Sequence, residues 1–354
     1  MCPDKNNEPI KITLDDLAHV ATTAPTGAAT TPGRGPGDAK VYGSVGEAAD
    51  QRVETHEERG SILLQAWFYL GMAGLLGASL AWALAEPAFV DGAGRRWGNI
   101  WMIPMVVTLQ CVGFAIAESI VERSVKKAVV RGLLALPLGV VLAFLFDFAA
   151  GIIFNIGVAI AAGAGAQSFR NPAFWVARGV AWMVFGAAGG VVYGIVGQSS
   201  KKTLYGALGG VIGAGIGGMI FDPIVMISKG GAPSRAVGFA LLGIATGIAI
   251  GLVESALKDR WLYVTAGPLA GKQFILYKAR TMIGSDQKCD IYLFKDSNVL
   301  PEHAVVEIAG TRVQLRALGP AYVSGQPARL QVLQSGNSVQ IGRYAFRYSE
   351  RQRK

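Results

Sequence analysis

Cysteine and charge are both scarce in this chain of 354 residues. It has 3 cysteines and 3 histidines, and charged residues make up 16% of its length. Three scattered thiols are too few for a disulfide framework or a cysteine-ligated metal site, and the histidines show no ligand spacing. We therefore expect no metal, no cofactor and a reducing compartment for the soluble parts.

An apolar signal segment is also missing from the first residues. The opening stretch MCPDKNNEPI is polar, whereas a secretory signal needs a run of about 7–15 apolar residues. We expect the first membrane helix to serve as the insertion signal. Residues 21–46 consist largely of Ala, Thr, Gly and Pro, and such a composition buries too little apolar surface to offset the entropy lost on ordering. Residues 1–60 are therefore predicted to form a disordered cytoplasmic tail.

Long apolar runs fill the middle of the chain, from residue 61 to residue 257. A helix rises 1.5 Å per residue, so about 20 apolar residues cross a hydrocarbon core of roughly 30 Å. The runs predict an α-helical polytopic membrane domain with six spans. These are 62–85, 99–120, 128–150, 173–197, 203–228 and 236–257.

One apolar stretch, residues 151–169, does not fit this count of spans. A single helix over residues 132–169 is about 57 Å long, which is too long for one upright span. Two alternatives stay open. A re-entrant or interfacial piece keeps both termini on the same side of the membrane, whereas a seventh span separates them.

Three similar turns follow apolar helices: IVERSVKK (120–127), IVGQSSKK (195–202) and LVESALKD (252–259). Their offsets are 75 and 57 residues, and flanking Gly, Arg and Phe-Asp positions repeat with them. This pattern indicates internal helical-hairpin repeats. They lie near 111–150, 178–228 and 235–257, the last with one helix only. Because basic turns favour the cytoplasmic side, we expect an inner-membrane, multi-pass protein with both termini in the cytoplasm.

Glycine recurs every four residues in three of the expected helices, at 186/190/194, 209/213/217 and 243/247/251. This spacing lets helix backbones approach closely. We expect tight packing within one bundle, and the alternative is a face that forms a homo-oligomer or lines a pore.

Few charges lie near the helices, and none is predicted at the centre of a span. Asp147, Arg178, Asp222 and Arg235 fall at the predicted outer ends. We predict that they form two ion pairs, Asp222–Arg235 and Asp147–Arg178. Transport normally needs ionisable residues at mid-membrane, so the apolar centres give it no support.

A different pattern begins at residue 258. Short runs rich in Val, Ile and Tyr are separated by Gly, Pro and Asp turns, which predicts an all-β sandwich over residues 258–354. This region has 15 Lys and Arg against 7 Asp and Glu, so it supplies +8 of the net charge of +9. A basic domain beside a membrane suits an anionic lipid surface or an acidic partner. A solvated positive surface is the alternative.

Several motifs in this region resemble the forkhead-associated (FHA) domain. They are GPLAGKQFILYKARTMIGSDQKCDIYLFKDSNVLPEHAVVEI, AYVSGQ and LQSGNSVQIGRYAFRY, which follow one another in the order of that family over residues 260–350. The resemblance implies an FHA/SMAD-like sandwich of about eleven strands that holds a phosphothreonine peptide on loops at one end. The membrane part is similar to Gly-rich bacterial membrane proteins that carry such a domain at the C-terminus.

The resemblance also assigns a peptide site in which the phosphate-binding residues have changed. The phosphate-facing Arg of the family is Ser285 here and its phosphate-binding Ser is Leu300, whereas the loop-bracing His is kept as His303. No nucleophile stands near His303 in the sequence, so we expect a structural role for it. The candidate peptide contacts are Ser285, Lys288, Leu300, His303, Arg312, Ala321, Tyr322 and Ser324.

Fold and site together predict a membrane scaffold without catalytic activity. We expect its FHA-like domain to recruit a cytoplasmic protein, phosphorylated or not, to the lipid bilayer without strong dependence on phosphothreonine. No nucleic-acid partner is expected. One rival hypothesis is a channel or transporter regulated by that domain. Another is a true phosphothreonine reader with a pocket rebuilt from Lys288, Lys295 or Arg312.

Overall fold

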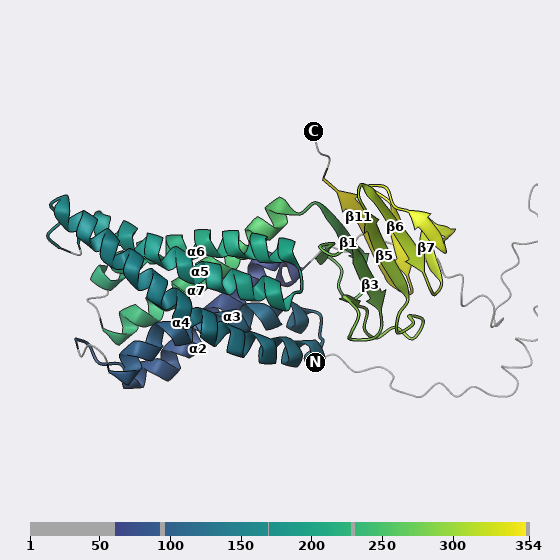
Figure 1. Ribbon diagram of the computed structural model, residues 1–354. Coiled ribbons are helices and arrows are strands. Elements are labelled where there is room, and N and C mark those ends of the chain that lie inside the picture. Colours follow the sequence, from purple (N-terminus) through teal and green to yellow (C-terminus); the bar gives the residue numbers. More distant parts are fainter. Residues whose placement is uncertain (1–60, 93–95, 169, 228–230, 352–354) are drawn as a thin grey trace, which may run out of the picture. The chain divides into compact units, whose positions relative to one another are not determined.

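The computed structural model describes residues 61–92, 96–168, 170–227 and 231–351 (Figure 1). The predicted tail, residues 1–60, lies outside them. Among the described residues, six helices are long and apolar enough to cross a membrane, and eleven strands follow them. The predicted class, a polytopic helical domain followed by an all-β sandwich, is confirmed.

The six predicted spans each overlap one long helix. These helices are α2 (Ala66–Ala85), α3 (Trp97–Val121), α4 (Val125–Gly163), α5 (Pro172–Val196), α6 (Ser200–Ile227) and α7 (Ala232–Leu257). Two short 3₁₀ helices, η2 (Ile62–Leu64) and η3 (Glu86–Ala88), flank α2.

Glycine sets the closest helix contacts in the bundle. Gly186 and Gly190 of α5 lie directly on the backbone of α6, at Gly210 and Gly206, so that a Cβ at any of these positions would clash. On the other side of the bundle, Gly247 of α7 meets the backbone of α2 in the same way. The glycine spacing therefore brings the α5–α6 and α2–α7 pairs into backbone contact.

Residues 151–163 form neither a re-entrant piece nor a separate span, because they continue α4. This helix has 39 residues and is about 58 Å long at 1.5 Å per residue, so it must tilt or extend beyond a hydrocarbon core. Asp147 does not interrupt it, because one carboxylate leaves the backbone hydrogen bonds of a helix intact. The helix ends before Gly165, which has a left-handed φ of 89° and so stops it.

The two ion pairs predicted at the outer helix ends are wrong. Arg178 Nε lies 2.9 Å from Asp222 Oδ2, and Arg235 pairs with Glu86 at 2.6 Å. Asp147 forms no ion pair with any residue that the structure describes. The prediction paired charges across the loops that join successive helices. The bundle instead pairs a residue of α5 with one near the end of α6, and a residue of α7 with η3, which follows α2.

The C-terminal strands form two sheets that enclose an apolar core. One sheet has the order β2-β1-β11-β10-β7-β8 and the other the order β4-β3-β5-β6-β9. Val264, Ile283 and Phe346 are among the fully buried side chains between them. The strands are β1 (Arg260–Ala266), β2 (Gln273–Ile275), β3 (Arg280–Gly284), β4 (Ile291–Tyr292), β5 (Ala304–Ala309), β6 (Arg312–Ala317), β7 (Ala321–Val323), β8 (Gln326–Pro327), β9 (Leu330–Val332), β10 (Ser338–Ile341) and β11 (Tyr344–Glu350).

Candidate functional site

The predicted peptide site lies at the end of the sandwich formed by the β3–β4, β4–β5 and β6–β7 loops, called here the loop end. His303 is fully buried there. Its Nδ1 accepts a hydrogen bond from the Leu300 N–H at 3.0 Å, so Nε2 carries the proton and donates to Pro320 O at 2.9 Å. The imidazole thus braces two loops, and neither ring nitrogen is free for catalysis.

Ser285 and Leu300, which stand at the family's two phosphate-binding positions, lie side by side. The Ser285 N–H donates to Leu300 O at 3.0 Å, and the Ser285 hydroxyl donates to Val299 O at 2.9 Å. The Leu300 side chain is 44% exposed. The place where the family holds a phosphate therefore offers a hydroxyl whose proton is already donated and an apolar side chain.

Arg312 lies at the far end of the sandwich from these loops. In the β5–β6 pair, Ala304 and Ala317 face each other at the loop end, whereas Arg312 faces Ala309 at the opposite hairpin. Five residues at about 3.4 Å each separate the two ends by roughly 17 Å. Arg312 is therefore too far from the loop end to contribute to a pocket there. The spacing of residues in the sequence had not shown which end of β6 it occupies.

The remaining candidates lie on β7, on the turn after it and on the β3–β4 loop. Ala321 is buried in the core, and Ser324 follows the far end of β7, where its hydroxyl accepts a hydrogen bond from Asn337. Neither side chain reaches the surface of the loop end. Tyr322 is half-buried on β7, and Lys288 is exposed on the β3–β4 loop.

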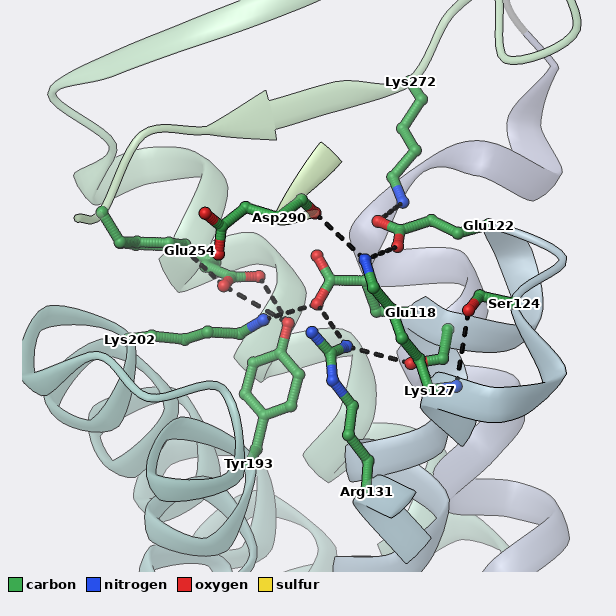
Figure 2. Close-up of polar contacts among 12 residues, drawn as sticks. Glu118, Glu122, Ser124, Lys127, Arg131, Tyr193, Lys202, Glu254, Lys272 and Asp290 are labelled. Atoms are coloured by element: carbon green, nitrogen blue, oxygen red, sulfur yellow. Dashed lines mark hydrogen bonds and ion pairs between the residues drawn. The ribbon is translucent and has the colours of Figure 1, made fainter. Parts of the chain in front are cut away.

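A second group of polar residues joins the helices to the sandwich (Figure 2), and we call it the charge cluster. Its side chains come from the ends of α3, α4, α5, α6 and α7 and from the turn between β1 and β2. In Figure 2 they point toward one another from these elements. The members are Glu118, Glu122, Lys127, Arg131, Tyr193, Lys202, Glu254 and Lys272.

Glu118 of α3 is the centre of this cluster. It accepts hydrogen bonds from Lys202 Nζ at 2.8 Å and from Arg131 Nη1 at 3.1 Å. The Lys202 ammonium also lies 4.1 Å from the ring centroid of Tyr193, whose hydroxyl donates to Glu254. Buried charges are tolerated when each has a partner of opposite charge, and Glu118, Lys202 and Arg131 satisfy that condition. Glu254 instead accepts hydrogen bonds from a tyrosine hydroxyl.

Lys272 of the sandwich forms an ion pair that is almost completely buried. Its Nζ lies 2.7 Å from Glu122 Oε1, and the two side chains are 1% and 2% exposed. Lys127 Nζ lies 3.6 Å from the other Glu122 oxygen. Taking away Glu122 would leave Lys272 buried without an ion-pair partner among the described residues, and taking away Lys272 would leave Glu122 only the longer contact with Lys127. Breaking a buried pair in this way is strongly destabilising. The pair therefore holds the turn between β1 and β2 to the end of α3.

Tyr277 gives the sandwich a second link to the helices. Its hydroxyl donates a hydrogen bond to Glu254 of α7. Burial and the nearby Glu254 carboxylate raise the pKa of Tyr277 well above its usual range, so the hydroxyl stays protonated at neutral pH. Ser124 also donates to Gln287 Oε1 at 3.2 Å. A cavity of about 90 Å³, lined in part by Glu118 and Tyr277, adjoins these contacts.

Two of the three basic turns, residues 120–127 and 195–202, carry members of the cluster and have the same backbone conformation at one position. Arg123 and Gln198, at equivalent positions, have left-handed φ values of 54° and 55°. The serine after each accepts a hydrogen bond from the N–H of Lys127 or Lys202. The sequence signal for the cluster was the recurrence of Lys in all three basic turns, with Glu in the first and the third. Lys272 carried no such signal, because a lysine in a β-turn is normally exposed.

Residues 263–352 match a family model described as the cytoplasmic domain of an inner membrane component of T3SS. The oxoglutarate dehydrogenase inhibitor of Corynebacterium efficiens is 36% identical over 86 residues, which cover 23% of this chain and 60% of that protein. The glycogen accumulation regulator GarA of Mycobacterium tuberculosis is 35% identical over 86 residues, 23% of this chain and 52% of that protein.

The crystal structure of the FHA domain of the CT664 protein from Chlamydia trachomatis is also similar. It is 25% identical, covers 27% of this chain and 100% of that chain, and has a TM-score of 0.25. The chain spans between half and two-thirds of the length of the two curated relatives. The C-terminal region thus matches domains of FHA type, and the described part of the chain also has six apolar helices long enough to span a membrane.

Proposed function

We propose that this protein is a membrane scaffold whose FHA-type domain recruits a protein partner through the loop end, without relying on phosphothreonine. One observation carries the proposal. Ser285 and Leu300 lie together at the position for a phosphate, yet the hydroxyl of the first donates to Val299 O and the second is an exposed apolar side chain. Neither supplies a charge or a free donor to a phosphate.

The free energy lost with the missing phosphate contacts is large enough to distinguish phosphothreonine reading from binding that does not need the phosphate. A hydrogen bond to a charged group contributes about 1.5–3 kcal/mol. Two missing contacts therefore cost about 3–6 kcal/mol, which is roughly a hundred- to ten-thousand-fold in affinity. A micromolar phosphothreonine reader would fall to about 0.1–10 mM. Arg312, one of the three basic residues of the rebuilt-pocket hypothesis, lies at the end of β6 that is opposite to the loop end.

Two exposed leucines at the loop end supply the alternative contact. Leu300 and Leu318 are 44% and 53% exposed. Both belong to loops tied to His303, since the Leu300 N–H donates to its ring and the Leu318 N–H to its carbonyl oxygen at 2.8 Å. Bracing by one buried residue fixes the two side chains before binding, so little entropy is lost when a partner covers them.

The proposal includes a topology with the FHA-type domain and all three basic turns in the cytoplasm. The matched family is described as a cytoplasmic domain of an inner membrane component, and the basic turns agree with the positive-inside preference. Single cysteines introduced beside Lys127, Lys202 or Lys258 should then resist a reagent that cannot cross the membrane, whereas one beside Asp91 should react. Labelling beside Lys202 from outside would contradict this topology.

Crosslinking in intact cells tests the loop end as the recruiting surface. The double variant Leu300→Glu/Leu318→Glu should lose the captured partner. The matched control Leu330→Glu/Val332→Glu changes two side chains on β9 that are 59% and 44% exposed, and it should keep the partner. Phosphatase treatment before capture from membranes should make no difference. Equal loss in both variants, or loss after phosphatase, would rule the proposal out.

A further inference from the structure

A second cavity lies beside the charge cluster, between α4, the end of α5 and the β3–β4 loop. Its volume is about 360 Å³. It is separate from the surface formed by Leu300 and Leu318, neither of which lines it. Its charged lining consists of five basic side chains and one carboxylate: Lys126, Lys127, Arg131, Lys278, Lys288 and Asp290.

Two of these basic side chains have no charged partner among the residues that the structure describes. Lys127, Arg131 and Lys278 lie 3.6, 3.1 and 2.8 Å from carboxylate oxygens. Lys126 and Lys288 are exposed and form no ion pair with any residue in the described part of the chain. The cavity therefore carries uncompensated positive charge, which favours an anionic ligand.

The cavity becomes apolar along α4. Val130 and Leu134, which are 49% and 55% exposed, line it and follow Lys126 at intervals of four residues. Residues four apart lie on the same face of a helix, so one face of α4 presents a charged side chain followed by two apolar ones. The most apolar stretch of α4 is only 17% buried, so this face of the helix is open to lipid. A fitting ligand has an anionic head and an apolar tail.

We propose that this cavity binds an anionic phospholipid. Its phosphate lies at Lys126 and Lys288, and its acyl chains follow Val130 and Leu134 along α4. Basic pockets beside membrane helices bind such headgroups. Because Lys126 belongs to α4 and Lys288 to the sandwich, one bound lipid contacts both parts of the protein. The lipid adds to the Lys272–Glu122 contact and does not depend on which protein the loop end recruits.

Lipid titration of the full-length protein in a neutral detergent, followed by native mass spectrometry, tests this site. The ligands are phosphatidylglycerol, phosphatidylcholine and soluble glycerol phosphate. Phosphatidylglycerol should bind at least tenfold more tightly than the other two, because only it has both a net negative head and acyl chains. The variant K126Q/K288Q should weaken phosphatidylglycerol binding roughly thirtyfold, since each lysine near an anionic headgroup contributes about fivefold.

The matched control is K201Q/K295Q, which removes the same charge outside the cavity. Lys201 occupies the position of Lys126 in the second basic turn but pairs with Asp259 at 2.9 Å, and Lys295 is exposed on the β4–β5 loop. This control should bind phosphatidylglycerol as the wild type does, and both variants should keep the wild-type unfolding temperature. Equal losses in the two variants would show general surface attraction and overturn the proposal. Equal binding of glycerol phosphate would indicate a soluble phosphate ligand instead, and equal binding of phosphatidylcholine would show that charge is not recognised.

Discussion

The loop end and the side of the FHA-type domain that contacts the helices differ in what they bury. The loop end exposes Leu300 and Leu318 over a neutral, hydrogen-bonded His303. The other side buries Lys272 against Glu122 of the helix bundle. An exposed apolar surface gains free energy when a partner covers it, and it stays stable in water when the partner is absent. Separating a buried ion pair breaks a short attraction between opposite charges, and a charge that stays buried without its partner is strongly unfavourable. The first surface suits exchangeable binding, and the second suits a permanent attachment.

The largest expected effect comes from breaking the permanent attachment. Lys272→Met should lower the free energy of unfolding of the full chain by about 3–5 kcal/mol, because Glu122 stays buried and keeps only the longer, 3.6 Å contact with Lys127. The double variant Lys272→Met/Glu122→Leu should recover part of this loss, since both charges of the 2.7 Å pair are gone while Lys127 loses its contact with Glu122. Denaturant unfolding in detergent measures both values. A loss below about 1 kcal/mol for the single variant would mean that the buried pair contributes no more stability than an exposed ion pair does.

At the loop end, the largest effect should come from the buried brace. His303→Ala leaves the Leu300 N–H and Pro320 O without their hydrogen-bond partners. Each unsatisfied buried group costs about 1–3 kcal/mol, or about 2–6 kcal/mol for two. Leu300 and Pro320 are themselves exposed, so water replaces part of the lost bonding, and we expect a loss of about 2–4 kcal/mol together with loss of partner capture. Denaturant unfolding and crosslinking of the same variant check this. Normal capture would show that the two loops do not need His303 to present their leucines.

Alkaline pH should weaken the attachment of the FHA-type domain to the helices. The pKa of Tyr277 is raised above the usual value near 10 by burial and by Glu254. Below pH 10 the hydroxyl is protonated in the folded and unfolded states, so its contribution to stability is complete. Above that pH the unfolded state loses the proton first, and stability falls by about 1.4 kcal/mol per pH unit. Tyr277→Phe should remove this part of the slope in unfolding curves between pH 9 and 11.5. Identical slopes for the variant and the wild type would contradict the assignment.

The smallest effect on stability is expected from the surface that should matter most for binding. Leu300→Glu/Leu318→Glu changes exposed side chains, so the free energy of unfolding should stay within about 0.5 kcal/mol of the wild type. The same variant should lose its partner. A loss of stability above about 1.5 kcal/mol, read from denaturant unfolding, would mean that the leucines pack inside the protein, and the contrast between the two regions would disappear.

The sequence predicted those features that depend on local pattern. Six helices follow from apolar runs of sufficient length, and an all-β region follows from short alternating runs. The number of about eleven strands was implied by the resemblance to the FHA family. The neighbours Ser285 and Leu300 were also found from motif positions. Such patterns repeat within a few residues and need no knowledge of packing.

Features that depend on distant packing were missed or wrong. Asp222 pairs with Arg178 and not with Arg235, because the choice among charged helix ends is made by the arrangement of the bundle. Lys272 gives no sign of burial in the sequence, since its environment is created by α3 from 150 residues earlier. Arg312 was misplaced because β6 is too short for spacing alone to distinguish its two ends.

The most direct test of the account compares phosphothreonine and threonine at the loop end. The full-length protein in detergent is titrated with matched peptide pools that carry a central Thr or phospho-Thr, at low salt and at 1 M salt. High salt reduces the screening length to about 3 Å, so it suppresses the unspecific attraction of a basic domain for phosphate. The account predicts that any preference for phospho-Thr falls below tenfold at 1 M salt. A preference above tenfold that survives 1 M salt would show a working phosphate pocket and contradict it.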